Sequence, residues 1–312
     1  MAGEYPKVME TLLPYSGADV FLEPLDGNHG DRLILLGTER VMRQLHFRRV
    51  DDPHKADLIL VNGGGGLFVQ PWCADLHRFR SYAHGFVDTP MVVLPSSYFW
   101  GDANLAECFA RRRAPVTLFA RGPGSLVRLQ AAGLPESVAL GLDHDMALHL
   151  ADSPLVENAR KVRSQGYLLL VERFDEEHVG AAAPPLTSFR ALRKCLPAKV
   201  QPVARRLLDH MRFRRSELHG VVRELACAER PELRDLPVVY NDVSNVTRNS
   251  FDDFVRIIAQ AEAVVSTRLH VGILAAMLQK LTFLKDGPGD YRKLWSVYTQ
   301  SLATTPHVQL LE

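Results

Sequence analysis

Short apolar runs of strand length recur along the chain, and each of them ends in glycine or small polar residues. In the first half these runs are "ADVFLEPL", "ADLILVNGGGGLF", "PMVVLPSS" and "PVTLFARGPGS". Residues 31–45 lie between the first two, and their apolar side chains recur with roughly helical spacing at Leu33, Leu36, Val41 and Leu45. Strands that alternate with amphipathic helices are typical of an α/β fold with a parallel sheet.

The same alternation restarts after a polar break near residues 150–165. The second half carries the strand-like runs "YLLLVERFDEEH", "LPVVYND", "AEAVVST" and "KLTFLKD". The helix-like segments between and after them are "SFDDFVRIIAQ", "HVGILAAMLQ" and "DYRKLWSVYTQSLA". We therefore predict two Rossmann-like domains facing across a cleft, one over residues 1–150 and one over residues 151–312. The basic segment 186–235 follows no such pattern. We interpret it as an insertion or as a set of loops and helices of the second domain.

The charge balance and the cysteines argue against several classes of function. Lys and Arg total 37 and Asp and Glu total 36, so the formal net charge is +1 and nothing favours nucleic acid as a partner. The four cysteines are far apart and form no CxxC pair, which argues against a zinc site and a disulfide framework. The sequence shows no signal peptide and no window apolar enough to span a membrane. We therefore expect a cytoplasmic protein without a metal, and the oligomeric state stays open.

The candidate ligand-binding residues follow strands, and α/β sheets bind ligands in the loops at the carboxyl ends of their strands. Two glycine-rich loops, "LDGNHGD" and "NGGGGLF", point to Asn28 and Asp31 and to Gly64 and Gly65. The second loop does not fit GxGxxG and no GxxxxGK[ST] occurs, so a nucleotide fingerprint is absent. A tight strand-to-helix turn is an equal alternative for the second loop, and a capped helix N-terminus would alone explain Asp31.

The stretch "AVVSTRLHVGILAA" places Arg268 and His270 two residues apart, between a strand-like and a helix-like run. A buried arginine is costly unless it is paired, and a lone histidine at a strand end is more often structural than catalytic. If the backbone is still extended there, the two side chains share a face; if the helix has begun, they diverge. The residue types alone leave both interpretations open.

Three segments in this order, "GNHGDRLILLGTERVM", "ADLILVNGGGGLF" and "AVVSTRLHVGILAAMLQKLTFL", resemble the polysaccharide pyruvyl transferase family. The S-x-R-L-H stretch is the most specific of the three. "FARGPGS", "YLLLVERFD", "DYRKL" and "DMALHL" resemble further elements of the family, although Met146 stands where proline is usual. The resemblance covers roughly residues 20–300.

This resemblance implies a GT-B-like fold and a reaction. Family members transfer the enolpyruvyl part of phosphoenolpyruvate to a sugar, usually as a cyclic pyruvate ketal, and release phosphate. Phosphoenolpyruvate is then the donor substrate, and no cofactor is expected. By the same resemblance, the expected catalytic residues are His270, Arg268 and Asp31. The residues expected to bind substrate are Arg121, Asn28, Gly64, Gly65, Ser266 and Arg173.

The chemistry of the residues fits this donor. Arginine binds phosphate and carboxylate groups bidentately, and Arg268 and Arg121 both follow strands, from which they would reach the cleft from opposite walls. Histidine titrates near neutral pH, so His270 suits the proton transfers to the vinyl carbon and from the sugar hydroxyl.

Several assignments stay open. His29 and His84 are alternative proton carriers, and Asp31 or Asp145 could assist them. The expected acceptor is a sugar of an exopolysaccharide or related glycan, and a role of the segment 186–235 in binding the acceptor stays open. A lipid-linked acceptor would bring Arg212–Arg215 to the inner face of the membrane, although a solvated helix face explains that stretch more simply. Two other functions fit the fold: a GT-B glycosyltransferase with a nucleotide-sugar donor, and a non-catalytic relative that binds glycan or phosphate.

Overall fold

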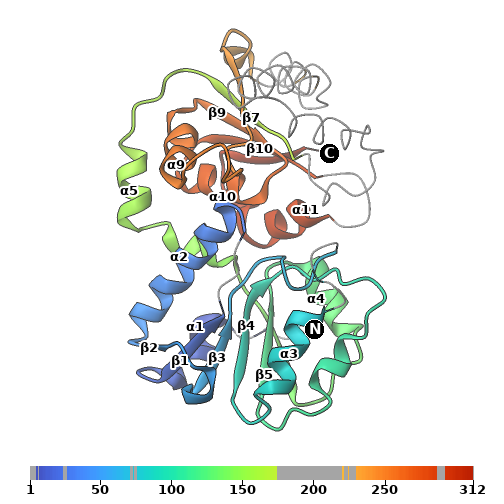
Figure 1. The fold of residues 1–312 in the computed structure, drawn as a ribbon. Helices are drawn as coiled ribbons and strands as arrows, with labels where there is room; N and C mark the ends of the chain where they lie inside the picture. The colour runs from blue at the N-terminus through green and yellow to red at the C-terminus, as the bar shows by residue number, and fades with distance from the viewer. Residues whose placement is uncertain are drawn as a thin grey trace, which may run out of the picture.

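Two parallel β-sheets form the framework of the protein in the computed structural model (Figure 1). The structure describes residues 7–23, 27–70, 76–173, 230–286 and 292–311, together with Tyr5, Cys73, Gly220 and Glu224. One sheet lies in the N-terminal half of the chain and the other in the C-terminal half. Figure 1 shows one half above the other, with helix α2 running between them.

The N-terminal sheet has six parallel strands in the order β2-β1-β3-β4-β5-β6. Their bounds are β1 Asp19–Glu23, β2 Arg48–Val50, β3 Leu58–Val61, β4 Met91–Ser96, β5 Val116–Ala120 and β6 Val138–Leu142. Every residue of β3 and β4 is buried, as expected of parallel strands that are covered on both faces. The four strands predicted in this half are confirmed. The pattern does not predict β2, which begins with two exposed arginines, or β6, in which only Val138 and Gly141 are buried.

The C-terminal sheet has five parallel strands in the order β11-β10-β9-β7-β8. Their bounds are β7 Leu168–Val171, β8 Val238–Tyr240, β9 Ala263–Ser266, β10 Leu281–Lys285 and β11 Val308–Leu311. The four strands predicted in this half are confirmed, and β11 adds a fifth at the edge. Counted along the chain within each half, the first five strands follow the same order, 2-1-3-4-5, which is one of the common orders of doubly wound sheets.

Helices connect the strands in both halves. The α-helices are α1 Val8–Leu12, α2 His29–Gln44, α3 His77–Gly85, α4 Pro123–Gln130, α5 Pro154–Arg160, α9 Phe251–Gln260, α10 Leu269–Met277 and α11 Lys293–Val297. Short 3₁₀ turns are η1 Leu13–Tyr15, η2 Pro53–Lys55, η4 Leu105–Phe109, η5 Met146–Leu150 and η6 Pro231–Leu233, and η7 Tyr298–Leu302 is a π-helical turn. The predicted helices are confirmed as α2, α9, α10 and α11.

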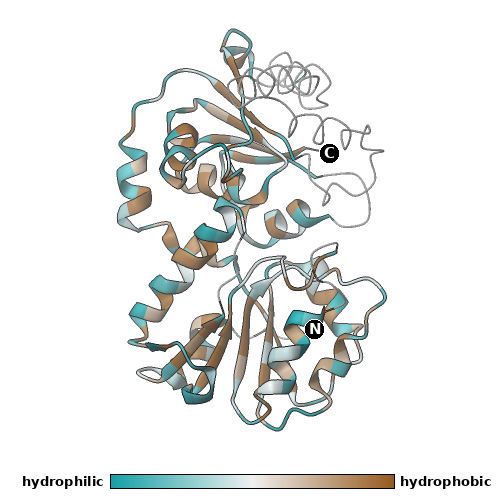
Figure 2. Cartoon of the chain, viewed as in Figure 1, coloured by the Kyte–Doolittle hydropathy of each residue, from teal (hydrophilic) through white to brown (hydrophobic). Residues whose placement is uncertain are grey.

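The predicted α/β fold of two Rossmann-like halves in a GT-B-like arrangement is confirmed, since each half contains one all-parallel sheet with helices between its strands. The strands of both sheets are largely hydrophobic (Figure 2). The domain boundary at residues 150/151 stays a prediction. Most of the segment 186–235, including Arg212–Arg215, lies outside the described residues. Among the described residues, no helix is both long and apolar enough to cross a membrane.

Helix α2 contacts both halves. Near its C-terminal end, Val41 and Met42 are buried in the core of the N-terminal sheet. Near its N-terminal end, Leu33 is buried in the core of the C-terminal half. The ring of His29 packs against the rings of Phe251 and Phe254, with centroid distances of 5.8 and 5.4 Å. Apolar contacts at both ends therefore hold α2 between the two sheets.

Helix α2 packs so closely on η5 that Gly37 has no room for a side chain. A Cβ at Gly37 would lie 1.9 Å from the carbonyl oxygen of Met146. We expect Gly37→Ala to lower the free energy of unfolding by about 1–3 kcal/mol, because overpacking forces the backbone to shift. Urea denaturation measures this. Gly85→Ala is the control, since no atom lies within 4 Å of a Cβ there. Equal stabilities for the two variants would contradict the close packing.

Candidate functional site

The carboxyl ends of the strands bring the predicted site residues together. In each sheet the strand order reverses at one point, between β1 and β3 in the first and between β7 and β9 in the second. Ligands of open α/β sheets bind outside the strands at such points. Asn28 and Gly64 follow β1 and β3, and Arg173 and Arg268 follow β7 and β9. The predicted residues therefore lie at both reversal points.

A buried carboxylate, Asp145, joins the two halves at the site. Its side chain follows β6 and is 0% exposed. Oδ1 accepts a hydrogen bond from the backbone N–H of Ala147 at 2.9 Å. Oδ2 accepts one from Arg121 Nη1 at 2.7 Å and lies 3.3 Å from His270 Nε2. Burial raises the pKa of Asp145, but the neighbouring His270 and Arg121 outweigh burial and hold the pKa well below its usual range. The carboxylate is therefore ionised at neutral pH.

Arg121 is the second member of this cluster. It follows β5 and is 1% exposed. Its Nε donates to Ser97 Oγ at 2.8 Å and its Nη1 to Asp145, whereas the buried Nη2 has no hydrogen-bond partner among the described residues. A Cβ at Gly65 would lie 3.8 Å from this Nη2 and 3.8 Å from Lys293 Nζ. The glycine thus leaves space beside two cationic groups, where a carboxylate or phosphate oxygen would be bound.

His270 is held between Asp145 and helix α2. Its Nε2 lies against the Asp145 carboxylate, and the tautomer with a proton on Nε2 donates to that oxygen. The other side of the ring packs on Gly30, where a Cβ would lie 2.3 Å from Nδ1. Only a glycine at the start of α2 therefore allows the imidazole to occupy this position.

Arg268 and His270 diverge, because helix α10 has already begun. Arg268 is the N-cap residue with an extended backbone, and the helix starts at Leu269. The Arg268 guanidinium pairs with Asp242 of the same half through Nε at 3.2 Å and Nη2 at 2.7 Å. Ser266 Oγ accepts from the backbone N–H of Arg268 at 2.9 Å and so shapes the turn between β9 and α10. A shared face for Arg268 and His270, one of the two sequence alternatives, is not present.

The N-terminal glycine-rich loop caps helix α2. Asn28 Oδ1 accepts from the backbone N–H of Gly30 at 2.7 Å, and Asp31 Oδ2 accepts from the backbone N–H of Asn28 at 2.8 Å. The structure thus shows the capping role that was the alternative for Asp31. Gly64 has a φ of +127°, and a Cβ there would lie 3.8 Å from Asp31 Oδ1. The two glycine-rich loops are therefore neighbours.

The remaining candidates, Arg173, His29 and His84, each contact a hydroxyl or carbonyl oxygen. The backbone N–H of Arg173 donates to Thr267 Oγ1 at 2.7 Å. His29 Nε2 lies 2.8 Å from the carbonyl oxygen of Asn249, and His84 on α3 lies 3.1 Å from that of Glu107. Among the described residues, no group of three or more His, Cys, Asp or Glu side chains is placed to hold a metal ion.

Sequence reasoning did not single out two side chains that the structure brings to Arg121. Ser97 accepts its Nε hydrogen bond, and Lys293 lies on the other side of Gly65. Both had a signal in the sequence: Ser97 ends the run "PMVVLPSS", and Lys293 belongs to "DYRKL". Asp145 was considered only as a helper, whereas it is the group that connects Arg121 to His270.

A comparison with protein families identifies the family of the chain. A family model described as polysaccharide pyruvyl transferase matches residues 28–283. The chain belongs to the polysaccharide pyruvyl transferase family. The match includes Asn28, Arg121, Asp145 and His270, and the family predicted from the motifs is confirmed. The transferase is therefore a pyruvyltransferase in the general sense of its family. No curated protein matches the sequence.

One solved structure resembles the transferase in fold, and a second gives a weaker match. An uncharacterized protein of Klebsiella pneumoniae superposes with a TM-score of 0.59 and 17% sequence identity, over 97% of this chain and 96% of that one. A co-structure of S. aureus MnaA with UDP matches with a TM-score of 0.37 and 9% identity, over 85% of this chain and 78% of that one. The first similarity extends over nearly the whole of both chains and shows a shared fold.

The buried cluster should dominate the stability of the transferase. Asp145→Asn leaves Arg121 and His270 without their shared carboxylate, so we expect the free energy of unfolding to fall by about 3–5 kcal/mol. Urea denaturation at neutral pH measures the change. Asp88→Asn is a matched control, because it breaks an ion pair with Arg113 that is exposed to solvent. An equal loss of unfolding free energy in Asp145→Asn and Asp88→Asn would show that the buried ion pair stabilises the protein no more than the exposed one.

The same cluster should make stability depend on pH. The pKa of Asp145 is lower in the folded protein than its unfolded value of about 3.9. Its contribution is therefore fully present above about pH 5 and is lost as the pH falls toward the folded pKa. We expect the stability difference between the wild type and Asp145→Asn to narrow from about pH 5 to about pH 2. A difference that stays constant over this range would show that Asp145 is not ionised.

Proposed function

We propose that the protein transfers the enolpyruvyl group of phosphoenolpyruvate to a sugar of an exopolysaccharide or related glycan and forms a pyruvate ketal. The observation that carries this proposal is the buried cluster Arg121–Asp145–His270, built from both halves at the carboxyl ends of the strands. It combines a histidine held by an ionised carboxylate with an arginine whose Nη2 remains available among the described residues. A donor that carries two anionic groups and reacts through proton transfers needs these two elements.

The proposed reaction balances without a further reactant. A proton adds to the CH₂ carbon of phosphoenolpyruvate, and a sugar hydroxyl attacks the carbon that bears the phosphate. The bond from this carbon to the phosphate oxygen breaks, and a second hydroxyl of the sugar attacks to close the ketal ring. The two hydroxyls give up two protons in total. One of them ends in the new methyl group and the other leaves with the phosphate.

The residues of the cluster have distinct roles in this proposal. His270 carries the protons, because imidazole titrates near neutral pH. Asp145 fixes the orientation of the ring, since its Oδ2 lies 3.3 Å from His270 Nε2. Arg121 Nη2 holds an oxygen of the donor beside Gly65. Arg268, paired with Asp242 at the start of α10, positions the helix that carries His270. Asn28, Asp31 and Gly64 shape the neighbouring loops, on which the acceptor is expected to lie.

Two other functions predict different results. A nucleotide-sugar transferase should be protected against heat by a nucleotide and not by phosphoenolpyruvate. A non-catalytic relative should bind ligand without release of phosphate. We would incubate the protein with phosphoenolpyruvate and a panel of glycan acceptors, measure the phosphate released, and detect the new methyl group of the ketal by proton NMR. Phosphate release that depends on an acceptor, together with the methyl signal, is the expected result. Binding of the donor without either signal would contradict the proposal.

Replacement of the proton carrier should lower turnover more than binding. We expect His270→Asn to reduce kcat by about 10²–10⁴-fold, because a positioned acid or base contributes that much, with a small change in the affinity for phosphoenolpyruvate. Single-turnover phosphate release and donor titration separate the two quantities. His84→Asn is the matched control, since His84 lies on α3 and contacts the carbonyl of Glu107. Wild-type turnover in His270→Asn would move the proton chemistry to another residue.

A further inference from the structure

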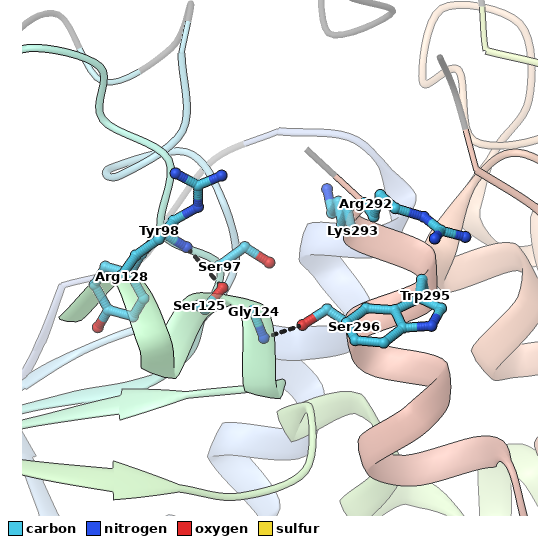
Figure 3. Close-up of a pocket in the computed structure, with 9 residues that line it drawn as sticks. All are labelled: Ser97, Tyr98, Gly124, Ser125, Arg128, Arg292, Lys293, Trp295 and Ser296. Carbon is cyan, nitrogen blue, oxygen red and sulfur yellow. Dashed lines mark hydrogen bonds between the residues drawn. The ribbon is translucent and has the colours of Figure 1, made fainter. Parts of the chain in front are cut away.

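A pocket of about 210 Å³ lies where the two halves face each other (Figure 3). Its N-terminal wall includes Ser97, which follows β4, and Ser125 and Arg128 on α4. Its C-terminal wall includes Lys293, Trp295 and Ser296 on α11. Figure 3 shows the two walls facing each other across the pocket. This pocket adjoins the site described above, and Ser97 and Lys293 belong to both.

The serine hydroxyls of this pocket are hydrogen-bond acceptors toward the protein. Ser97 Oγ accepts from Arg121 Nε at 2.8 Å, Ser125 Oγ from the backbone N–H of Tyr98 at 3.0 Å, and Ser296 Oγ from the backbone N–H of Gly124 at 3.1 Å. A hydroxyl that accepts in this way still has its own proton to donate. Three buried hydroxyls are thus arranged to donate toward one small space.

The charged side chains of the pocket are all cationic. Arg128 and Lys293 stand on opposite walls, and Arg292 adds a third positive charge at the start of α11. The Arg128 guanidinium is held 4.5 Å from the centroid of the Phe99 ring, and no carboxylate pairs with it among the described residues. None of the described residues that line the pocket is Asp or Glu. The lining therefore supplies hydrogen-bond donors and positive charge, and the Asp286 carboxylate at the first turn of α11 interacts electrostatically with Arg292 and Lys293.

The structure also explains why the C-terminal wall is firmly placed. The Asp286 carboxylate accepts from the backbone N–H groups of Leu294 at 2.8 Å and Trp295 at 2.7 Å. These bonds fix the first turn of α11, from which Lys293 and Trp295 project. The hydrogen bond between Gly124 and Ser296 then ties α11 to the start of α4 on the other wall. These hydrogen bonds therefore fix the positions of the two walls relative to each other, so little ordering is needed when a ligand binds.

We propose that this pocket is a phosphate-binding subsite formed by both halves of the protein. A phosphate has several oxygens that only accept hydrogen bonds and two negative charges to neutralise, which matches a lining of hydroxyl donors and cations on two walls. The assignment of this phosphate to the donor substrate rests on the proposed function. The phosphoryl group of phosphoenolpyruvate then lies between Arg128 and Lys293. Its carboxylate end points past Ser97 toward Arg121 Nη2, so the enol carbons lie near the buried cluster.

Inorganic phosphate tests the pocket without any turnover. We would titrate phosphate into the full chain by calorimetry, for the wild type and for Arg128→Gln and Lys293→Gln, which remove one charge from each wall. We expect each variant to weaken phosphate binding by about tenfold or more, the size of one charge-assisted hydrogen bond. Arg111→Gln is the matched control, because Arg111 is exposed and outside the pocket. It should bind phosphate like the wild type. Pyruvate, which has the carboxylate and no phosphate, should bind equally well to Arg128→Gln and the wild type.

The possible results separate the two proposals. Wild-type phosphate affinity in both Arg128→Gln and Lys293→Gln would overturn the pocket assignment, whatever the enzyme assay shows. The assignment would also be overturned if Arg128→Gln weakened pyruvate binding as much as phosphate binding, because the pocket would then not be selective for phosphate. Phosphate binding that depends on the pocket, without phosphate release from phosphoenolpyruvate with any acceptor, would support the subsite and contradict the proposed function. Circular dichroism of each variant shows that a loss of binding is not a loss of fold.

Discussion

The buried carboxylate of Asp145 is the interaction on which the arrangement of the site depends. It contacts Arg121, which follows a strand of the first sheet, and His270, which belongs to the first helical turn after a strand of the second. A buried charge without partners would strongly destabilise the fold, so the protein must keep both partners in place. The same contacts that stabilise the folded chain therefore also place an arginine and a histidine side by side.

Helix α2 makes this arrangement specific. Its N-terminal end is anchored in the C-terminal half by His29 and Leu33, while its C-terminal end belongs to the core of the other sheet. Because the helix begins directly against the imidazole of His270, residue 30 must lack a side chain. Gly30, in the first turn of α2, is thus required for a physical reason. It allows the helix backbone and the imidazole of His270 to approach where a larger residue would separate them.

The sequence was sufficient to predict the fold and the loops that form the site. It was not sufficient to predict which side chains pair with each other within the site. Strands such as β3 and β9 are continuous apolar runs bounded by glycine or polar residues, and that pattern is local. The partners are not local: Arg268 pairs with Asp242, and His270 pairs with Asp145 from the other half. No periodicity relates residues that meet only after two sheets have formed. The S-x-R-L-H motif therefore predicted that Arg268 and His270 are both important. It did not show that the two side chains pair with different carboxylates.

The pairing of arginines with carboxylates affects which side chains can attract an anionic donor. Arg268 is neutralised by Asp242, and Arg121 is largely committed to Asp145 and Ser97. Cations that are already paired with carboxylates position neighbouring groups more than they attract a ligand with two or more negative charges. The adjoining pocket adds further cationic side chains, with Arg128 on one wall and Lys293 on the other. Ser97 connects the two regions, since its hydroxyl lines the pocket while it accepts from Arg121. In the proposed reaction, the paired arginines organise the site, and the pocket between the halves adds cationic side chains that attract the anion.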